Sequence, residues 1–77
     1  MQIYEIGTSI KKLRKEKKMT QETLAKLAGI SRVTLGKLER GHFGAVSIVS
    51  LDIILSALGY EMDFKTKEGF GIPIFGE

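Results

Sequence analysis

The sequence contains no cysteine, only one histidine, and no apolar run that approaches the roughly 18 residues of a membrane-spanning helix. Disulfide bonds are therefore excluded, and so is a zinc finger, which needs several cysteine or histidine ligands. A chain of 77 residues buries too little surface to be very stable by itself. Without disulfides or metals, we expect its stability to come from helix packing and from a partner chain.

Signatures of catalysis and of cofactor binding are also absent. His42 has no second histidine or cysteine with which to form a metal site, and the sequence contains no nucleophile motif or glycine-rich phosphate loop. We therefore expect no enzymatic activity, no cofactor and no metal. The N-terminus places apolar residues before basic ones, the reverse of a secretory signal peptide, so a cytoplasmic location is expected.

The net charge of +3 conceals an asymmetry between two parts of the chain. Residues 1–45 carry ten Lys and Arg and four Asp and Glu, a net charge of +6, whereas residues 46–77 carry two Lys and five Asp and Glu, a net charge of −3. A basic region on a small domain favours a polyanionic partner such as nucleic acid. The run from Lys11 to Lys18 alone is equally consistent with a solvated helix face.

Four segments repeat their apolar residues at intervals of three and four, the period of an amphipathic helix, as Ile6, Ile10 and Leu13 do in the first. A Thr or Ser that can cap the first turn precedes each of the last three segments, and a glycine that can end a helix follows each of them. The predicted helices are 4–18, 21–28, 32–40 and 48–58, with caps at Thr20, Ser31 and Ser47 and stops at Gly29, Gly41 and Gly59.

Residues 60–66 follow a different pattern. Tyr60, Met62 and Phe64 alternate with charged residues, which predicts a β-strand with one apolar face. A lone strand leaves its hydrogen-bonding groups unpaired, and the last predicted helix has apolar residues such as Ile54 beyond its main stripe. We therefore expect a homodimer joined through Ile54 and the strand. The chain then divides into a helical domain (1–59), a dimerisation strand (60–66) and a flexible tail (67–77).

The segment from Met19 to Gly41 resembles the helix-turn-helix of the lambda-repressor-like (Xre/Cro-type) family. With the flanking helices, the resemblance covers about residues 6–59. It implies a mostly α fold, in which a four-helix lambda-repressor-like DNA-binding domain is followed by one C-terminal β-strand that pairs across a dimer. Gly36 and Leu27 depart from the pattern, because the family usually has Ser or Thr at the first position and a polar residue at the second. The matching positions are Thr20-Gln21, Leu24-Ala25, Gly29-Ile30-Ser31, Leu35, Leu38 and Glu39-Arg40-Gly41.

The resemblance also implies roles for individual residues. Arg14 and Glu39 match a buried ion pair that joins the first helix to the end of the third; the alternative role for Arg14 is a phosphate contact. Gln21 matches a position that contacts the DNA backbone and supports the base-reading side chains, and we include it among the base-reading residues.

The third helix is expected to enter the major groove by its N-terminal residues. With Leu35 and Leu38 turned inward, Gly36 and the base-reading candidates Arg32, Val33 and Lys37 would face outward. Arg32 can bind O6 and N7 of guanine, and Val33 can contact a thymine methyl group. The alternatives are partial burial for Val33 and a solvated face for Arg32 and Lys37.

Phosphate contacts are expected where helices begin, because free backbone N–H groups there can bind anions. Arg40 and His42, at and after the end of the third helix, are expected to bind phosphate as well. The predicted phosphate contacts are Thr20, Ser31, Thr34, Arg40 and His42.

Two functions remain open from the sequence. A helix-turn-helix followed by one strand resembles HipB-type antitoxins, which implies a repressor of its own operon that also binds a HipA-like toxin kinase. The alternative is a stand-alone Xre-family transcriptional regulator with no toxin partner. Both imply a homodimer on a palindromic double-stranded DNA operator, and a cytoplasmic protein associated with the nucleoid. A kinase-like neighbouring gene would favour the antitoxin.

Overall fold

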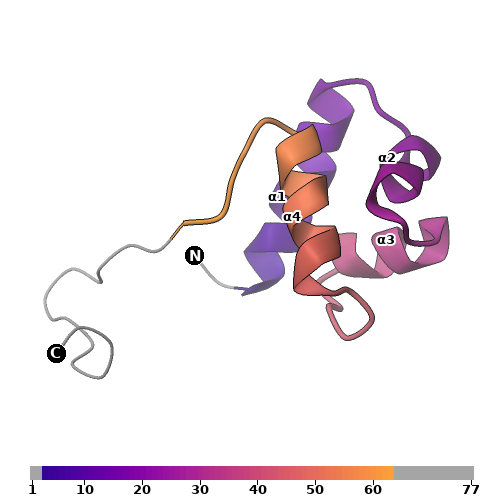
Figure 1. Cartoon of the computed structure of the whole chain (residues 1–77). Helices are drawn as coiled ribbons and strands as arrows, with labels where there is room; N and C mark the ends of the chain where they lie inside the picture. Colours follow the sequence, from indigo (N-terminus) through magenta and orange to yellow (C-terminus); the bar gives the residue numbers. More distant parts are fainter. Residues whose placement is uncertain (1–2, 64–77) are drawn as a thin grey trace, which may run out of the picture.

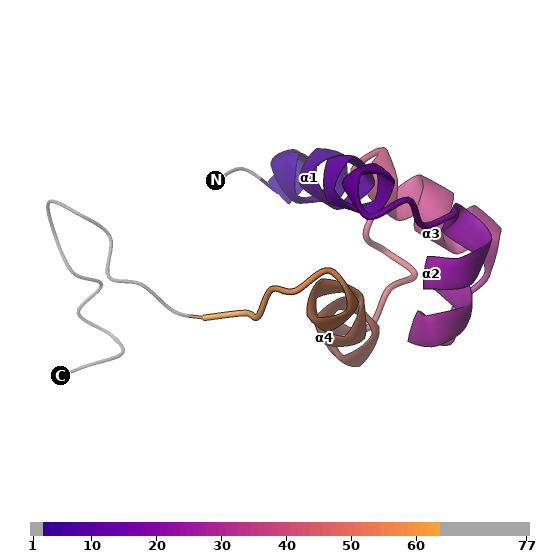
Figure 2. The same cartoon turned by 90° about the horizontal axis from the view of Figure 1, so that it is seen from above.

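The computed structural model describes residues 3–63, and these residues form four α-helices. α2 packs against both α3 and α4, while α1 packs against α3 (Figure 1). The view from above separates α1 from α4 and shows α2 and α3 together at one end of the pair (Figure 2). The helices are α1 (Ile3–Glu16), α2 (Gln21–Ala28), α3 (Arg32–Glu39) and α4 (Ile48–Ala57).

The core is formed by apolar side chains from all four helices. The inner face of α3 packs against this core. Leu35 and Leu38 of α3 are both fully buried. Phe43 and Val46, from the loop between α3 and α4, are half-buried against the same cluster. Burying one large apolar side chain contributes roughly 1.5–3 kcal/mol, so α3 is held mainly by these contacts. The buried apolar residues are Ile10, Leu24, Ala25, Ala28, Leu35, Leu38, Ile54 and Leu58.

The predicted caps are confirmed, and the helix bounds agree with the predicted ones to within two residues. Thr20, Ser31 and Ser47 each accept a hydrogen bond of 3.0 Å from the backbone N–H three residues further on. The main difference is that α1 ends at Glu16, because Lys18 adopts the left-handed conformation with φ of 58°. The chain then turns toward α2, and the N–H of Met19 bonds to the carbonyl oxygen of Arg14 at 3.0 Å.

One sequence-based expectation about side-chain direction was wrong. Ile54 was expected in a dimer interface, but it is fully buried in the core of a single chain, because this face of α4 is turned inward. The exposed large apolar residues of α4 are instead Ile48, Val49 and Ile53. Gly36 lies on the outer side of α3, as expected, but it is buried because the side chains of Arg40 and Gln21 lie over it.

The C-terminal strand stays a prediction. Residues 60–63 form no strand in the described chain, and the N–H of Tyr60 instead bonds to the carbonyl oxygen of Leu55 at 2.8 Å, which closes the end of α4. Phe64, the remainder of the predicted strand and the predicted tail 67–77 lie outside the described residues. None of the helices within residues 3–63 has the length and apolar character needed to traverse a lipid bilayer.

Candidate nucleic-acid interface

The turn between α2 and α3 is fixed at both of its ends. Gly29 adopts a left-handed conformation with φ of 72°, which ends α2, and the N–H of Ile30 bonds to the carbonyl oxygen of Ala25 at 3.0 Å. Ile30 packs half-buried against the core, and Ser31 then caps α3. The three-residue turn therefore sets the direction in which α3 leaves α2, as in a helix-turn-helix.

Gly7 allows α1 to approach the end of α3 closely. A Cβ atom at this position would lie directly against the carbonyl oxygen of Leu38 and 3.1 Å from the carbonyl carbon and oxygen of Glu39. No local signal reveals the role of Gly7, because the residues that it meets are about 30 positions further along the chain.

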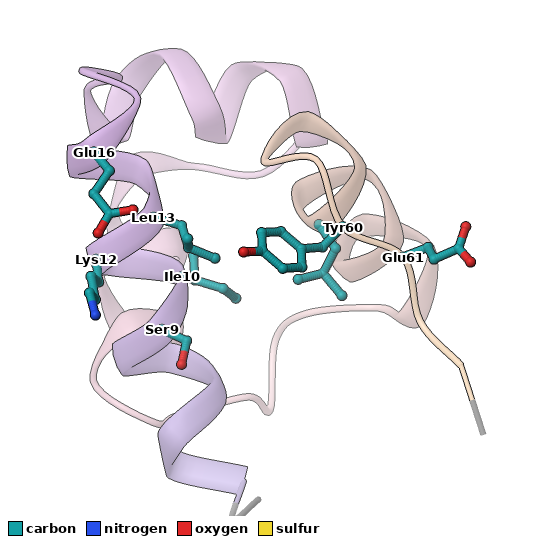
Figure 3. A pocket seen from close by; sticks show the side chains of 8 residues that line it. Ser9, Ile10, Lys12, Leu13, Glu16, Tyr60 and Glu61 are labelled. Carbon is teal, nitrogen blue, oxygen red and sulfur yellow. The ribbon is translucent and has the colours of Figure 1, made fainter. Parts of the chain in front are cut away.

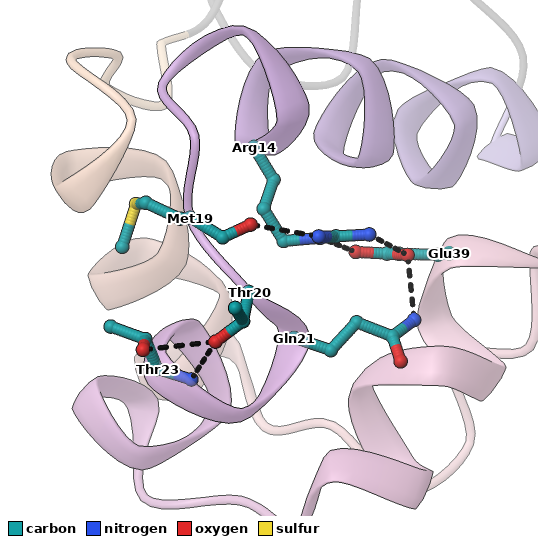
Figure 4. Close-up of polar contacts among 6 residues, drawn as sticks. All are labelled: Arg14, Met19, Thr20, Gln21, Thr23 and Glu39. Carbon is teal, nitrogen blue, oxygen red and sulfur yellow. Dashed lines mark hydrogen bonds and ion pairs between the residues drawn. The ribbon is translucent and has the colours of Figure 1, made fainter.

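Arg14 and Glu39 form an ion pair between α1 and α3 (Figure 4). The Nε of Arg14 donates to Oε2 of Glu39 at 2.7 Å, and its Nη2 donates to Oε1 at 3.2 Å. Both side chains are buried, with 8% and 2% of their surface exposed. The Nη1 of Arg14 also donates to the carbonyl oxygen of Met19 at 2.8 Å. One guanidinium therefore joins α1, the end of α3 and the chain just before α2.

Gln21 completes this network from the first position of α2. Its Nε2 donates to Oε1 of Glu39 at 3.0 Å (Figure 4). Because an ionised carboxylate only accepts hydrogen bonds, Glu39 fixes which end of the amide faces it. The Oε1 of Gln21 consequently points away from Glu39. The beginning of α2 and the end of α3 are thus held together by side-chain bonds as well as by packing.

The outer face of α3 carries the residues expected to read bases. Arg32 and Lys37 are exposed, and 55% of Val33 is exposed, so partial burial of Val33 is not observed. Two side chains lie over Gly36, that of Arg40 and that of Gln21. A Cβ at position 36 would be 3.5 Å from Nη1 of Arg40 and 3.7 Å from Nε2 of Gln21. The structure therefore brings Gln21 and Arg40 together over α3.

The residues expected to contact phosphate lie around this face, and two of their hydroxyl groups are already used in caps. Ser31 Oγ accepts from the N–H of Thr34 and donates to Thr34 Oγ1 at 2.9 Å. Thr20 Oγ1 accepts from the N–H of Thr23 and donates to Thr23 Oγ1 at 3.0 Å. Thr23 was not among the phosphate contacts predicted from the sequence. Among the other expected phosphate contacts, Arg40 and His42 are exposed and Thr34 is half-buried.

Comparison with known proteins identifies the fold. The family model described as Helix-turn-helix matches residues 10–65. The restriction-modification controller protein C.AhdI from Aeromonas hydrophila has a similar solved structure, with 37% identity and a TM-score of 0.67 over 77% of this chain and 88% of that one. The iron(II) form of HppE in complex with substrate matches at 27% identity and a TM-score of 0.67, over 78% of this chain but only 34% of that one.

A curated relative matches at the sequence level. The immunity repressor protein of Bacillus phage phi105 is 39% identical over 57 residues. The match covers 74% of this chain, which spans only 39% of the repressor's length. The family match extends over the turn between α2 and α3, the Arg14–Glu39 pair and the exposed face of α3. The chain therefore belongs to the lambda-repressor-like helix-turn-helix family.

Proposed function

We propose that this protein is a transcriptional repressor that binds a specific double-stranded DNA sequence by inserting α3 into the major groove. The observation that carries the proposal is the division of α3 into two faces. Leu35 and Leu38 are fully buried, while Arg32 and Lys37 are exposed on the other side. Arg32, in the first turn, supplies the donors that recognise guanine, and Val33 offers an apolar surface to a thymine methyl group. The immunity repressor and controller relatives support the same role.

Phosphate contacts would fix the position of α3 on the DNA. Arg40 and His42 are exposed, and both can donate hydrogen bonds to a phosphate. The hydroxyl oxygens of Ser31 and Thr34 lie 2.9 Å apart. Because each hydroxyl can donate or accept, the pair has one hydroxyl proton left to donate to a phosphate. The hydroxyl groups of Thr20 and Thr23, which lie 3.0 Å apart, offer one proton to a phosphate in the same way.

The ion pair of Arg14 and Glu39 would act by orientation rather than by direct contact with DNA. Both residues are buried, and Glu39 also accepts from Gln21. This arrangement favours the structural role of Arg14 over the alternative of a phosphate contact. We propose that Glu39 holds Gln21 in position to buttress the base-reading side chains and to contact the DNA itself.

Homodimerisation would use the exposed apolar face of α4. Ile48 and Val49 are 72% and 65% exposed, and Ile53 is 38% exposed. Apolar side chains so exposed on a small domain are typical of a surface that binds another protein. Met62, beyond the end of α4, is 41% exposed and would extend this interface. Two linked domains bind two half-sites far more tightly than one domain binds one, which explains why the dimer matters for repression.

The direct experiment selects preferred duplexes from a random DNA pool and titrates the enriched sequence against a scrambled one at several salt concentrations. We expect an enriched palindrome, affinity about 10³-fold or more above that for the scrambled duplex, and affinity that falls as salt rises. Equal affinity for both duplexes would refute sequence-specific binding. In parallel, Ile53→Asp should yield monomers in sedimentation, whereas Thr8→Asp, at an exposed position of α1, should leave dimers.

The antitoxin function stays a prediction. It depends on the resemblance of residues 60–66 to the strand of HipB-type antitoxins and on a HipA-like toxin kinase as partner. The relatives reported above are an immunity repressor and a controller protein, so a stand-alone regulator is the better supported of the two functions. Co-purification with the product of a kinase-like neighbouring gene would decide for the antitoxin.

A further inference from the structure

A groove of about 460 Å³ lies between α1 and α4, next to the point where the described chain ends. Its apolar lining consists of Ile10 and Leu13 from α1, Leu55 from α4, and Tyr60 (Figure 3). Leu13 and Leu55 are half-buried, and 55% of Tyr60 is exposed. The four helices thus leave an apolar surface open here, bordered by the polar residues Ser9, Lys12, Glu16 and Glu61.

The sequence after residue 63 contains a segment suited to this groove. Phe70, Ile72 and Ile74 alternate with Gly71 and Pro73. In an extended chain, alternate side chains lie on one face, so the three large apolar side chains would share a face and the opposite face would carry only glycine and proline. Proline also disfavours a helical conformation of the residue before it. The pattern therefore predicts an extended segment with one apolar face.

We propose that residues 70–74 of the same chain occupy the groove between α1 and α4 as an extended segment. Phe70, Ile72 and Ile74 would then cover Leu13, Leu55 and Tyr60. This interaction would bury apolar side chains on both sides, which is the main source of favourable free energy in such contacts.

The lengths are compatible with this arrangement. The lining residues of α1 run from Ser9 to Glu16, a distance of about 10 Å along a helix that rises 1.5 Å per residue. Five extended residues span about 16 Å at roughly 3.3 Å per residue, so residues 70–74 can follow the whole groove. Residues 64–69 span up to about 20 Å, which allows the chain to turn back from Glu61 on the groove's own border.

The polar residues at the border of the groove can form hydrogen bonds with the backbone of the bound segment. Extended backbone presents N–H and C=O groups that must find partners when they are buried. Glu16 and Ser9 can accept from its N–H groups, while Lys12 and Ser9 can donate to its carbonyl groups. The proline at position 73 removes one N–H that would otherwise need a partner.

The absence of cysteine makes a spin-label experiment straightforward. Glu77→Cys would carry a nitroxide label, and broadening would be measured in NMR signals of methyl-labelled leucine and isoleucine, without DNA. We expect the Leu13 and Leu55 signals to lose most of their intensity. The signal of Leu27, which is 56% exposed on α2 and does not line the groove, should keep its intensity. Because no DNA is present, the result does not depend on the proposed repressor function.

Two tail variants provide a matched test. Ile72→Asp places a charge on the apolar face of the segment and should abolish the broadening, whereas Gly71→Asp places the same charge on the opposite face and should preserve it. Whether the segment binds its own chain or a second copy is tested with a mixture in which one set of chains carries the spin label and the other carries the isotope label. Broadening in this mixture reports contact between two chains. The proposal is wrong if Leu13 and Leu55 keep their intensity, if both variants behave alike, or if broadening appears only in the mixture, which would assign the groove to a second copy.

Discussion

Replacing Gly7 by alanine tests how closely α1 must approach α3. The added Cβ would lie directly against the carbonyl oxygen of Leu38 and 3.1 Å from the carbonyl atoms of Glu39. These are backbone atoms, so no side-chain rotation relieves the contact and the two helices must separate. Overpacking of this kind typically costs about 1–3 kcal/mol, whereas Gly→Ala in an unobstructed helix stabilises by up to about 1 kcal/mol.

We therefore expect Gly7→Ala to lower the free energy of unfolding by about 2 kcal/mol. In a domain of this size, that loss lowers Tm by about 8–16 °C. The measurement is urea denaturation followed by circular dichroism, with all variants at one protein concentration, because the proposed dimerisation would make apparent stability depend on concentration.

The matched control is Gly36→Ala, which makes the same change at another buried helical glycine. Here the Cβ would meet only side-chain atoms, Nη1 of Arg40 at 3.5 Å and Nε2 of Gln21 at 3.7 Å, which are ordinary contact distances. Gly36→Ala should raise the free energy of unfolding by up to about 1 kcal/mol. If Gly7→Ala were as stable as the unmodified protein, the close packing of α1 on α3 would be refuted.

Three further predictions concern stability and use the same denaturation assay. Lys18→Gly should stabilise by about 1 kcal/mol, because glycine adopts a φ of 58° without the steric penalty of a side chain; a loss would show that the turn has another conformation. Arg14→Ala should destabilise by about 3–5 kcal/mol, and adding Glu39→Ala should recover part of the loss, because the double variant leaves no unpaired buried charge; additive losses would contradict this reasoning. Ile54→Ala should cost about 2–5 kcal/mol, and Ile53→Ala much less; equal losses would contradict the assignment of Ile54 to the core.

Local features of the fold were predictable because they depend on neighbouring residues. Ser31 caps α3 through the N–H of Thr34, three residues away, and Gly29 ends α2 by its own backbone conformation. All the residues that make up such a signal lie within about one helical turn of one another. The end of α1 was less predictable, because Lys18 adopts a left-handed conformation that lysine rarely favours.

Features that depend on packing between distant segments were not predictable in the same way. Ile54 and Ile53 are adjacent in an apolar stretch, and only the placement of α4 against α2 decides that Ile54 is buried and Ile53 is partly exposed. The roles of Gly7 and Gly36 depend on atoms from other segments or side chains. The pairing of Arg14 with Glu39 came from the family resemblance, since no periodicity joins residues 25 positions apart.

The central claim is that α3 reads bases, and the most direct measurement compares Arg32→Ala with Arg40→Ala on the selected operator and on a scrambled duplex. If Arg32 binds a base, Arg32→Ala should weaken operator binding by about 5- to 150-fold, corresponding to about 1–3 kcal/mol, and leave binding to the scrambled duplex nearly unchanged. Arg40→Ala should weaken both by similar factors and reduce the salt dependence. Equal weakening of both duplexes by Arg32→Ala, or no effect on either, would contradict the account.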